Sequence, residues 1–278
     1  MAIDKRIINL GIQINEDLTW YGGLDTPLYI EAKGQAFANP TEAGCDITVL
    51  GLRKEIRDFI LQNTKPLNPN RTRISVILEV GRESYGTSIR YQGDVFRSEM
   101  IGKPDTGLTL LCRTGYYAKS KLVSRSASEI TKLSSIAKWV ADDCGYGLSF
   151  EIADRNIRSY SFTGSAQSQL QQLEEIANAE VYVNGGTMYV KEPGKAAKGI
   201  AVRFVDNNSG LLSALPTEAG VKIAMLYDPV TTIGTRIELI TGLNPSINGG
   251  YTVYKAEYHV ANRTDPFYLT VDCTPAND

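Results

Sequence analysis

Apolar and polar residues alternate along short runs of the chain near both of its ends. A period of two places one set of side chains on a core face and the other set outward, which indicates β-strands. Before residue 118 the apolar positions of these runs are Cys45, Ile47, Val49; Ile74, Val76, Leu78, Val80; and Leu108, Leu110, Cys112. Beyond residue 195 they are Val221, Ile223, Met225; Ile237, Leu239; Tyr254, Ala256, Tyr258, Val260; and Phe267, Leu269, Val271.

One helix interrupts the strands of the first part of the chain. Leu52, Ile56, Phe59 and Ile60 recur at helical spacing, which predicts a short amphipathic helix over residues 53–61. A single helix among short strands is typical of a small barrel or sandwich.

The middle of the chain has a different period. Ser126 followed by Glu129 has the pattern of a capping box, and we expect a helix to begin there and to end at Gly145. Its apolar stripe is Ile130, Leu133, Ile136, Ala137, Val140 and Ala141. A short strand is expected over residues 148–152, and a second helix from about Ser165.

A hairpin should follow the second helix. The apolar runs at residues 181–183 and 188–190 are separated by Asn184, Gly185 and Gly186. Asn-Gly between such runs is a strong hairpin signal, because both residues tolerate positive φ. The middle segment is therefore expected to be a small α+β module.

These patterns divide the chain into three units. We expect a mainly β protein with an α+β part, in which two small β-barrels, residues 1–117 and 196–278, flank an α+β module at residues 118–195. A length of 278 residues is consistent with two or three compact units.

Charge and composition exclude several functions. Hydrophobic residues make up 42% and charged residues 22%, as in ordinary globular proteins. Basic and acidic residues number 14 and 14 before residue 118, 9 and 9 in the middle segment, and 6 and 8 after it. Without a basic excess, sequence-independent binding of nucleic acid is disfavoured. No run has the length of a membrane span, and no signal peptide is visible, so synthesis and assembly in a cytoplasm are expected.

The residue types that perform catalysis are sparse. The one histidine, His259, shares a strand face with Lys255 and Glu257, so a solvated or interfacial role is expected. The adjacent carboxylates Asp142-Asp143 and Glu174-Glu175 are expected on solvated helix faces. The four cysteines, Cys45, Cys112, Cys144 and Cys273, lie far apart without a CxxC pattern, which favours buried free thiols.

Motifs for nucleotide, calcium or hydrolase sites are absent from the sequence. We therefore expect no enzyme, and no catalytic, cofactor-binding or metal-binding residue. The 15 tyrosines fit sheet packing, and they also suit subunit contacts.

The middle segment resembles baseplate hub proteins of contractile-tailed bacteriophages. The resemblance is carried by residues 133–140, Gly145-Tyr146-Gly147, the segment 160–165 and the continuation through residues 169–173 to 181–183. Residues 43–52, leading into the helix at residues 53–61, resemble the family's first tail-tube-like barrel, and residues 220–239 resemble the start of the second.

The resemblance implies a structural role in a phage tail. Such hubs form a homotrimeric ring between the six-fold tail tube and the three-fold central spike, among other baseplate proteins, and the lumen passes DNA after contraction. It further implies a virion protein, assembled in the host cytoplasm, with no direct membrane insertion and no sequence-specific binding of nucleic acid.

Other classes stay open at this point. A tube or distal-tail component is the nearest alternative, and a hexamer would favour it. A phage-borne cell-wall hydrolase would require two converging carboxyl groups that the fold could assemble. A carbohydrate-binding module has only the tyrosines to support it.

Overall fold

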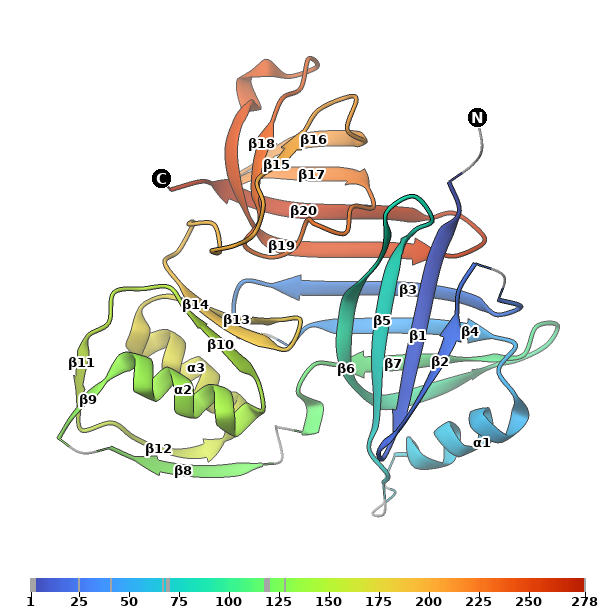
Figure 1. The fold of residues 1–278 in the computed structure, drawn as a ribbon, viewed down its shortest axis with the longest axis horizontal. Coiled ribbons are helices and arrows are strands. Elements are labelled where there is room, and N and C mark those ends of the chain that lie inside the picture. Colours follow the sequence, from blue (N-terminus) through green and yellow to red (C-terminus); the bar gives the residue numbers. More distant parts are fainter. Residues whose placement is uncertain are drawn as a thin grey trace.

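The structure is a computed structural model that describes residues 4–24, 26–40, 42–66, 68, 71–117, 121–127 and 129–277. The two terminal segments contribute the strands of one 13-stranded sheet, and the middle segment forms a small α+β unit beside it (Figure 1). The expectation of a mainly β protein with an α+β part is confirmed.

In the described part of the N-terminal segment, seven strands and one α-helix are present. The elements are β1 (Arg6–Ile14), β2 (Asp17–Gly22), β3 (Tyr29–Phe37), β4 (Gly44–Leu50), α1 (Lys54–Asn63), β5 (Ile74–Arg82), β6 (Gly86–Ile101) and β7 (Gly107–Arg113). Neighbouring strands follow the order β3-β4-β7-β6-β5-β1-β2, and every pair is antiparallel. In Figure 1, β5 and β1 cross over the layer of β3, β4 and β7, so the segment has two layers.

The long strand β6 belongs to both layers. Its first part, up to Asp94, pairs with β5, and its second part, from Asp94 to Ile101, pairs with β7. The register with β7 shifts between Val95 and Arg97, where β6 contains an extra residue, Phe96. Such a bulge bends a strand and increases its twist, which is how one strand can serve two crossing layers.

The C-terminal segment has a related layout. Its elements are β15 (Arg203–Val205), β16 (Leu211–Thr217), β17 (Gly220–Leu226), β18 (Arg236–Leu239), the 3₁₀ turn η2 (Pro245–Ile247), β19 (Gly249–Ala261) and β20 (Phe267–Pro275). The order is β16-β17-β20-β19, with β18 on the first part of β19 and β15 parallel to β18. The register between β19 and β20 also shifts, between Val253 and Lys255.

The middle segment contains two helices and short strands. Its elements are β8 (Leu122–Ser126), β9 (Ile130–Lys132), α2 (Leu133–Cys144), β10 (Gly147–Phe150), β11 (Asn156–Arg158), β12 (Ser161–Ser165), α3 (Ala166–Ala177), β13 (Glu180–Asn184) and β14 (Thr187–Lys191). The second helix and the hairpin are confirmed: the Ser168 N–H donates to the Ser165 hydroxyl at the start of α3, and β13 pairs with β14 around Gly185 and Gly186. Gly145, with φ of 78°, ends α2 as expected.

The capping box expected at Ser126 is wrong. Ser126 is the last residue of β8 and pairs with Ser161 of β12, and α2 begins seven residues later, at Leu133. Ile130, expected on the buried stripe, is 55% exposed. Pairing with strands about 30 residues further along outweighs the local helix signal, since tertiary context routinely overrides weak local preference.

Apolar residues gather in two cores. One cluster runs from Ile8 to Cys273 and includes residues of both terminal segments, and the other lies between α2, α3 and the three-stranded sheet β10-β14-β13. The division at residues 117/118 and 195/196 stays a prediction, and its first boundary falls at residues 118–120, outside the described ranges. Within those ranges the sheet path ends at β16 and β2, without pairing between these two strands.

Candidate assembly interface

The terminal segments meet strand to strand. The second part of β19 pairs antiparallel with β3 over seven positions, from Lys255 opposite Phe37 to Ala261 opposite Glu31. The ladder is extended at both ends, where the Ala38 N–H donates to the Tyr254 carbonyl (2.7 Å) and the Asn262 N–H donates to the Ile30 carbonyl (3.1 Å). Two segments far apart in sequence thus form one continuous layer, seen in Figure 1 as the strands from β16 to β7.

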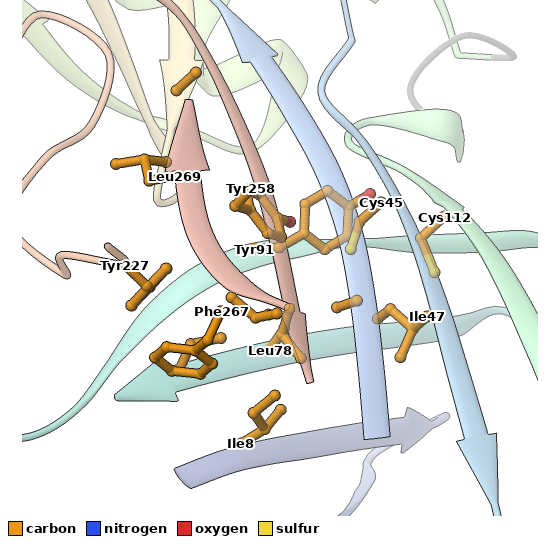
Figure 2. Close-up of a cluster of buried hydrophobic side chains, with 14 of the residues drawn as sticks. Ile8, Cys45, Ile47, Leu78, Tyr91, Cys112, Tyr227, Tyr258, Phe267 and Leu269 are labelled. Carbon is orange, nitrogen blue, oxygen red and sulfur yellow. The ribbon is translucent and has the colours of Figure 1, made fainter. Parts of the chain in front are cut away.

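A tyrosine fills the core side of this junction. Tyr258 of β19 lies opposite Gly34 of β3, and a Cβ atom at Gly34 would be 2.2 Å from the Tyr258 ring. Figure 2 shows Tyr258 and Tyr91 side by side near Cys45. Tyr258 is 5% exposed, so its ring has little room to move, and only glycine fits beneath it.

The expected buried thiols occupy this core. Cys45 and Cys112 are opposite each other on β4 and β7, both fully buried and free, and Cys273 is buried on β20. Burial raises the pKa of the Cys45 thiol to about 12. A thiol held in its protonated form packs as a small apolar group rather than acting as a nucleophile. Cys144 is only partly buried.

His259 lies on the outer side of the same junction. Its Nε2 is 2.6 Å from Glu31 Oε1 across the strand pair, and its ring contacts Tyr268 edge-on. Burial acts to raise the pKa of Glu31, but hydrogen bonds from His259 and Tyr29 and the charge of Lys33 outweigh it, so the pKa lies below its usual range. The lone histidine therefore sits where two chain segments join, a placement that its strand face alone does not reveal.

We expect His259→Ala to change the free energy of unfolding by only about 0.5 kcal/mol, as for most substitutions outside the core. Glu31 keeps its hydrogen bond from Tyr29 and its ion pair with Lys33, so its carboxylate stays compensated. Urea unfolding of the two proteins checks this. A complete loss of function in a normally folded variant would contradict the non-catalytic interpretation of His259.

The adjacent carboxylates Asp142 and Asp143 have structural partners. Arg125 donates two hydrogen bonds to Asp143, at 2.6 and 2.9 Å, and Lys138 pairs with Asp142. These Arg125 hydrogen bonds hold the pKa of Asp143 below its usual range. The expectation of a solvated face is wrong for Asp143, which is 7% exposed, because β8 brings Arg125 against α2.

Exposed strand edges are the other candidate contact surfaces. Within the described part of the chain, the edge strand β16 pairs only with β17, and β2 pairs only with β1. The second part of β6 pairs with β7 on one side and has no described strand on the other. Apolar side chains are exposed at these edges: Leu18, Trp20, Met100, Leu212 and Leu215, each between 42% and 58%.

The outer face of the joined layer is polar and slightly hollowed. Residues from β3, β4, β7, β17, β19 and β20 line the hollow. In the order of the strands across the layer, from β17 to β7, the charged side chains alternate in sign: Lys222, Glu257, Lys33, Asp46 and Arg113. Such a mixed surface lacks the basic stripe that binding to nucleic acid would require.

Across the described ranges, no three His, Cys, Asp or Glu side chains come together in a way that could hold a metal ion. None of the described helices is long and apolar enough to cross a membrane.

Solved tail proteins share this fold. The structure is similar to the 43 kDa tail protein of prophage MuSo2 from Shewanella oneidensis, with a TM-score of 0.64 at 8% identity over 96% of this chain and 98% of that chain. It is similar to the tail protein from Neisseria meningitidis MC58, with the same TM-score and identity over 96% of each chain. The E. coli c3393 protein, a component of the type VI secretion system, gives 0.60 at 8% identity, over 96% of this chain and 77% of that chain.

The chain thus has the fold of solved phage tail proteins. No curated protein matches the sequence. Residues 7–273 match the family described as baseplate hub gp41, and the chain belongs to this family. Its role is that of a structural component of the phage tail baseplate.

Proposed function

We propose that three copies of this protein form a ring that joins the six-fold tail tube to the three-fold central spike. The ring is the hub of a contractile-tail baseplate, and its lumen passes DNA after contraction. It is assembled in the host cytoplasm together with tube, spike and other baseplate proteins. The role is mechanical and needs no catalysis, in keeping with a histidine and carboxylates that serve strand and helix contacts.

One observation carries the proposal: the two terminal segments repeat the same strand order. From the edge inward, β3-β4-β7-β6-β5 corresponds to β16-β17-β20-β19-β18, and all neighbours in both series are antiparallel. The segments differ outside this set, since β1 is antiparallel to β5 whereas β15 is parallel to β18, and α1 follows β4 only.

The amino-acid sequence repeats as well. Residues 41–50, TEAGCDITVL, and residues 217–226, TEAGVKIAML, are identical at six of ten positions. These decapeptides contain the corresponding strands β4 and β17, and in both a glycine, Gly44 or Gly220, is the first residue of the strand. The repeat supports two similar β units in one chain, within residues 1–117 and 196–278.

Two similar units per chain solve a symmetry problem. A three-fold ring can face a six-fold tube without mismatch only if each subunit offers two equivalent surfaces, about 60° apart. Three chains then present six units, and closure around an axis requires head-to-tail contacts between them.

Native mass spectrometry of the purified protein, alone and with a spike protein, tests the proposal. We expect a species of three subunits, stabilised by the spike, because binding to the assembled state favours that state. A hexamer would favour a tube component, and a strict monomer under both conditions would contradict the hub. Release of soluble fragments from purified peptidoglycan would instead favour a hydrolase.

A further inference from the structure

The chain contains, inside itself, one copy of the contact that a ring would repeat between subunits. The correspondence between the two segments can be fixed residue by residue from their bulges. In β6, Val95 pairs with Cys112 and the next residue is skipped. In β19, Val253 pairs with Cys273 and the next residue is likewise skipped. Counting from these matching points, Arg97 to Ile101 of β6 correspond to Lys255 to His259 of β19.

The edge strands correspond in the same way. Gly34 of β3 is opposite Cys45, and Pro216 of β16 is opposite Val221, the residue that matches Cys45 in the repeated decapeptide. Lys33 therefore corresponds to Leu215. Within the chain, the edge strand β3 of the first unit pairs with the second part of β19 of the second unit, and His259 lies opposite Lys33.

Among the described residues, the counterparts of both partners lack a strand on one side. β16, which corresponds to β3, has no strand partner on the side away from β17, and the second part of β6, which corresponds to that part of β19, has none on the side away from β7. At the start of that part of β6, the Arg71 guanidinium donates to the Phe96 carbonyl, and α1 lies close to β6. The first part of the long strand is already paired in each unit, because β6 pairs with β5 and β19 pairs with β18. Unpaired edges with exposed apolar side chains are ready-made templates for strand addition.

We propose that β16 of one subunit adds antiparallel to the second part of β6 of a neighbouring copy, with Ile101 opposite Leu215. This assignment rests on the proposed trimer and specifies its contact. Glu99 then lies opposite Thr217, and Met100 opposite Pro216. Met100, 58% exposed in the isolated chain, then takes the place of the buried Tyr258 and becomes covered on the core face, whereas Leu215 lies on the outer face beside Ile101.

Two residue differences distinguish the contact between subunits from the contact within the chain. Pro216 stands where β3 has Gly34, and Met100 stands where β19 has Tyr258. A proline donates no backbone hydrogen bond, so the ladder between subunits has up to one bond fewer than the ladder within the chain. A flexible methionine in place of the tyrosine ring accommodates the bulk of the proline. The contact between subunits is therefore the weaker of the two, which allows the ring to form from separately folded chains.

Disulfide trapping tests the register. We combine Ile101→Cys with Leu215→Cys in one chain, because residues directly opposite on paired strands have Cα atoms within disulfide range. The matched control, Met100→Cys with Leu215→Cys, differs by one position and points its two thiols to opposite faces. The expected result after mild oxidation is a covalent trimer for the first variant and a monomer for the control on a non-reducing gel.

The outcomes separate this contact from the trimer itself. If the protein has the mass of a trimer but does not cross-link, or if the control cross-links equally, the β16–β6 contact is wrong. Either result is still compatible with a trimeric ring. Covalent dimers from Leu215→Cys alone indicate a two-fold contact and overturn the register. A monomer at every concentration, with and without a spike protein and without cross-links, overturns both.

A charge on the edge gives an independent readout. Leu215→Asp should raise the concentration at which the trimer dissociates at least about tenfold, since it places a charge opposite the apolar Ile101 and a charged side chain on an edge strand opposes strand addition. Leu243→Asp is the matched control, because Leu243 is 94% exposed in the connection between β18 and β19 and lies outside the contact. Equal dissociation of both variants would count against the β16 edge.

Discussion

Glu180→Ala should lower the free energy of unfolding by about 3–5 kcal/mol, the usual cost of leaving a buried charge without its partner. Lys191 of β14 is 1% exposed, and its ammonium group donates to the carboxylate of Glu180 on the neighbouring strand β13 and to the Lys195 carbonyl (2.8 Å). Without Glu180 the ammonium group keeps the Lys195 carbonyl and the face of the Tyr182 ring, but no opposite charge. Urea unfolding followed by circular dichroism measures the change.

A double replacement is the control for this pair. Glu180→Leu together with Lys191→Met removes both charges and retains apolar volume, and such replacements are often neutral or stabilising. We expect it to unfold within about 1.5 kcal/mol of the unaltered protein. A loss in the double variant as large as in Glu180→Ala would show that the pair contributes through more than charge compensation.

Tyr258→Ala should cost about 3–5 kcal/mol, as for other large aromatic side chains removed from a core. The ring lies at the junction of the terminal segments, next to Tyr91 and Cys45, so its loss leaves a cavity between β19 and β3 (Figure 2). Because both segments share one core, we expect a single cooperative transition at lower denaturant concentration. Two separate transitions would show that the segments are stable independently.

Gly34→Val tests the same contact from the other strand. In the unaltered chain a side chain at Gly34 meets the Tyr258 ring, and overpacking of this kind usually costs about 1–3 kcal/mol. In the Tyr258→Ala background the ring is gone, and Gly34→Val should be nearly neutral or partly restore stability. Equal costs in both backgrounds would mean that the two residues are not coupled. Tyr258→Phe, which keeps the ring, is the conservative control.

Elements whose sequence signal lies within a few neighbouring residues could be predicted from the sequence. The alternation at residues 254–260 identifies the buried face of β19, on which Ala256, Tyr258 and Val260 lie, and Asn184-Gly185-Gly186 identifies the hairpin of β13 and β14. Each signal depends on residues within a few positions of one another. The local pattern predicts the start of α2 too early, because the strands β8 and β9 depend on partners, β12 and β11, that come later in the chain.

The junction of β3 with β19 could not be predicted in this way. Glu31 and His259 are 228 positions apart, and alternation specifies which face a residue occupies but not which strand lies beside it. One signal in the sequence does point to the duplication: the repeated decapeptide at residues 41–50 and 217–226. The repeat is a likeness between two distant segments, so the alternation of apolar and polar residues within each segment does not reveal it.

The continuous layer across the junction sets the width of a ring built from it. Each chain contributes eight strands to that layer: β3, β4, β7, the second part of β6, β16, β17, β20 and the second part of β19. Three chains give about 24 strands, and a spacing of about 4.8 Å between neighbours corresponds to a circumference of about 115 Å and a backbone diameter of about 37 Å. Any tilt of the strands from the ring axis widens this opening. In the proposed ring, the number of strands paired across the junctions, rather than the size of any side chain, would therefore set the bore.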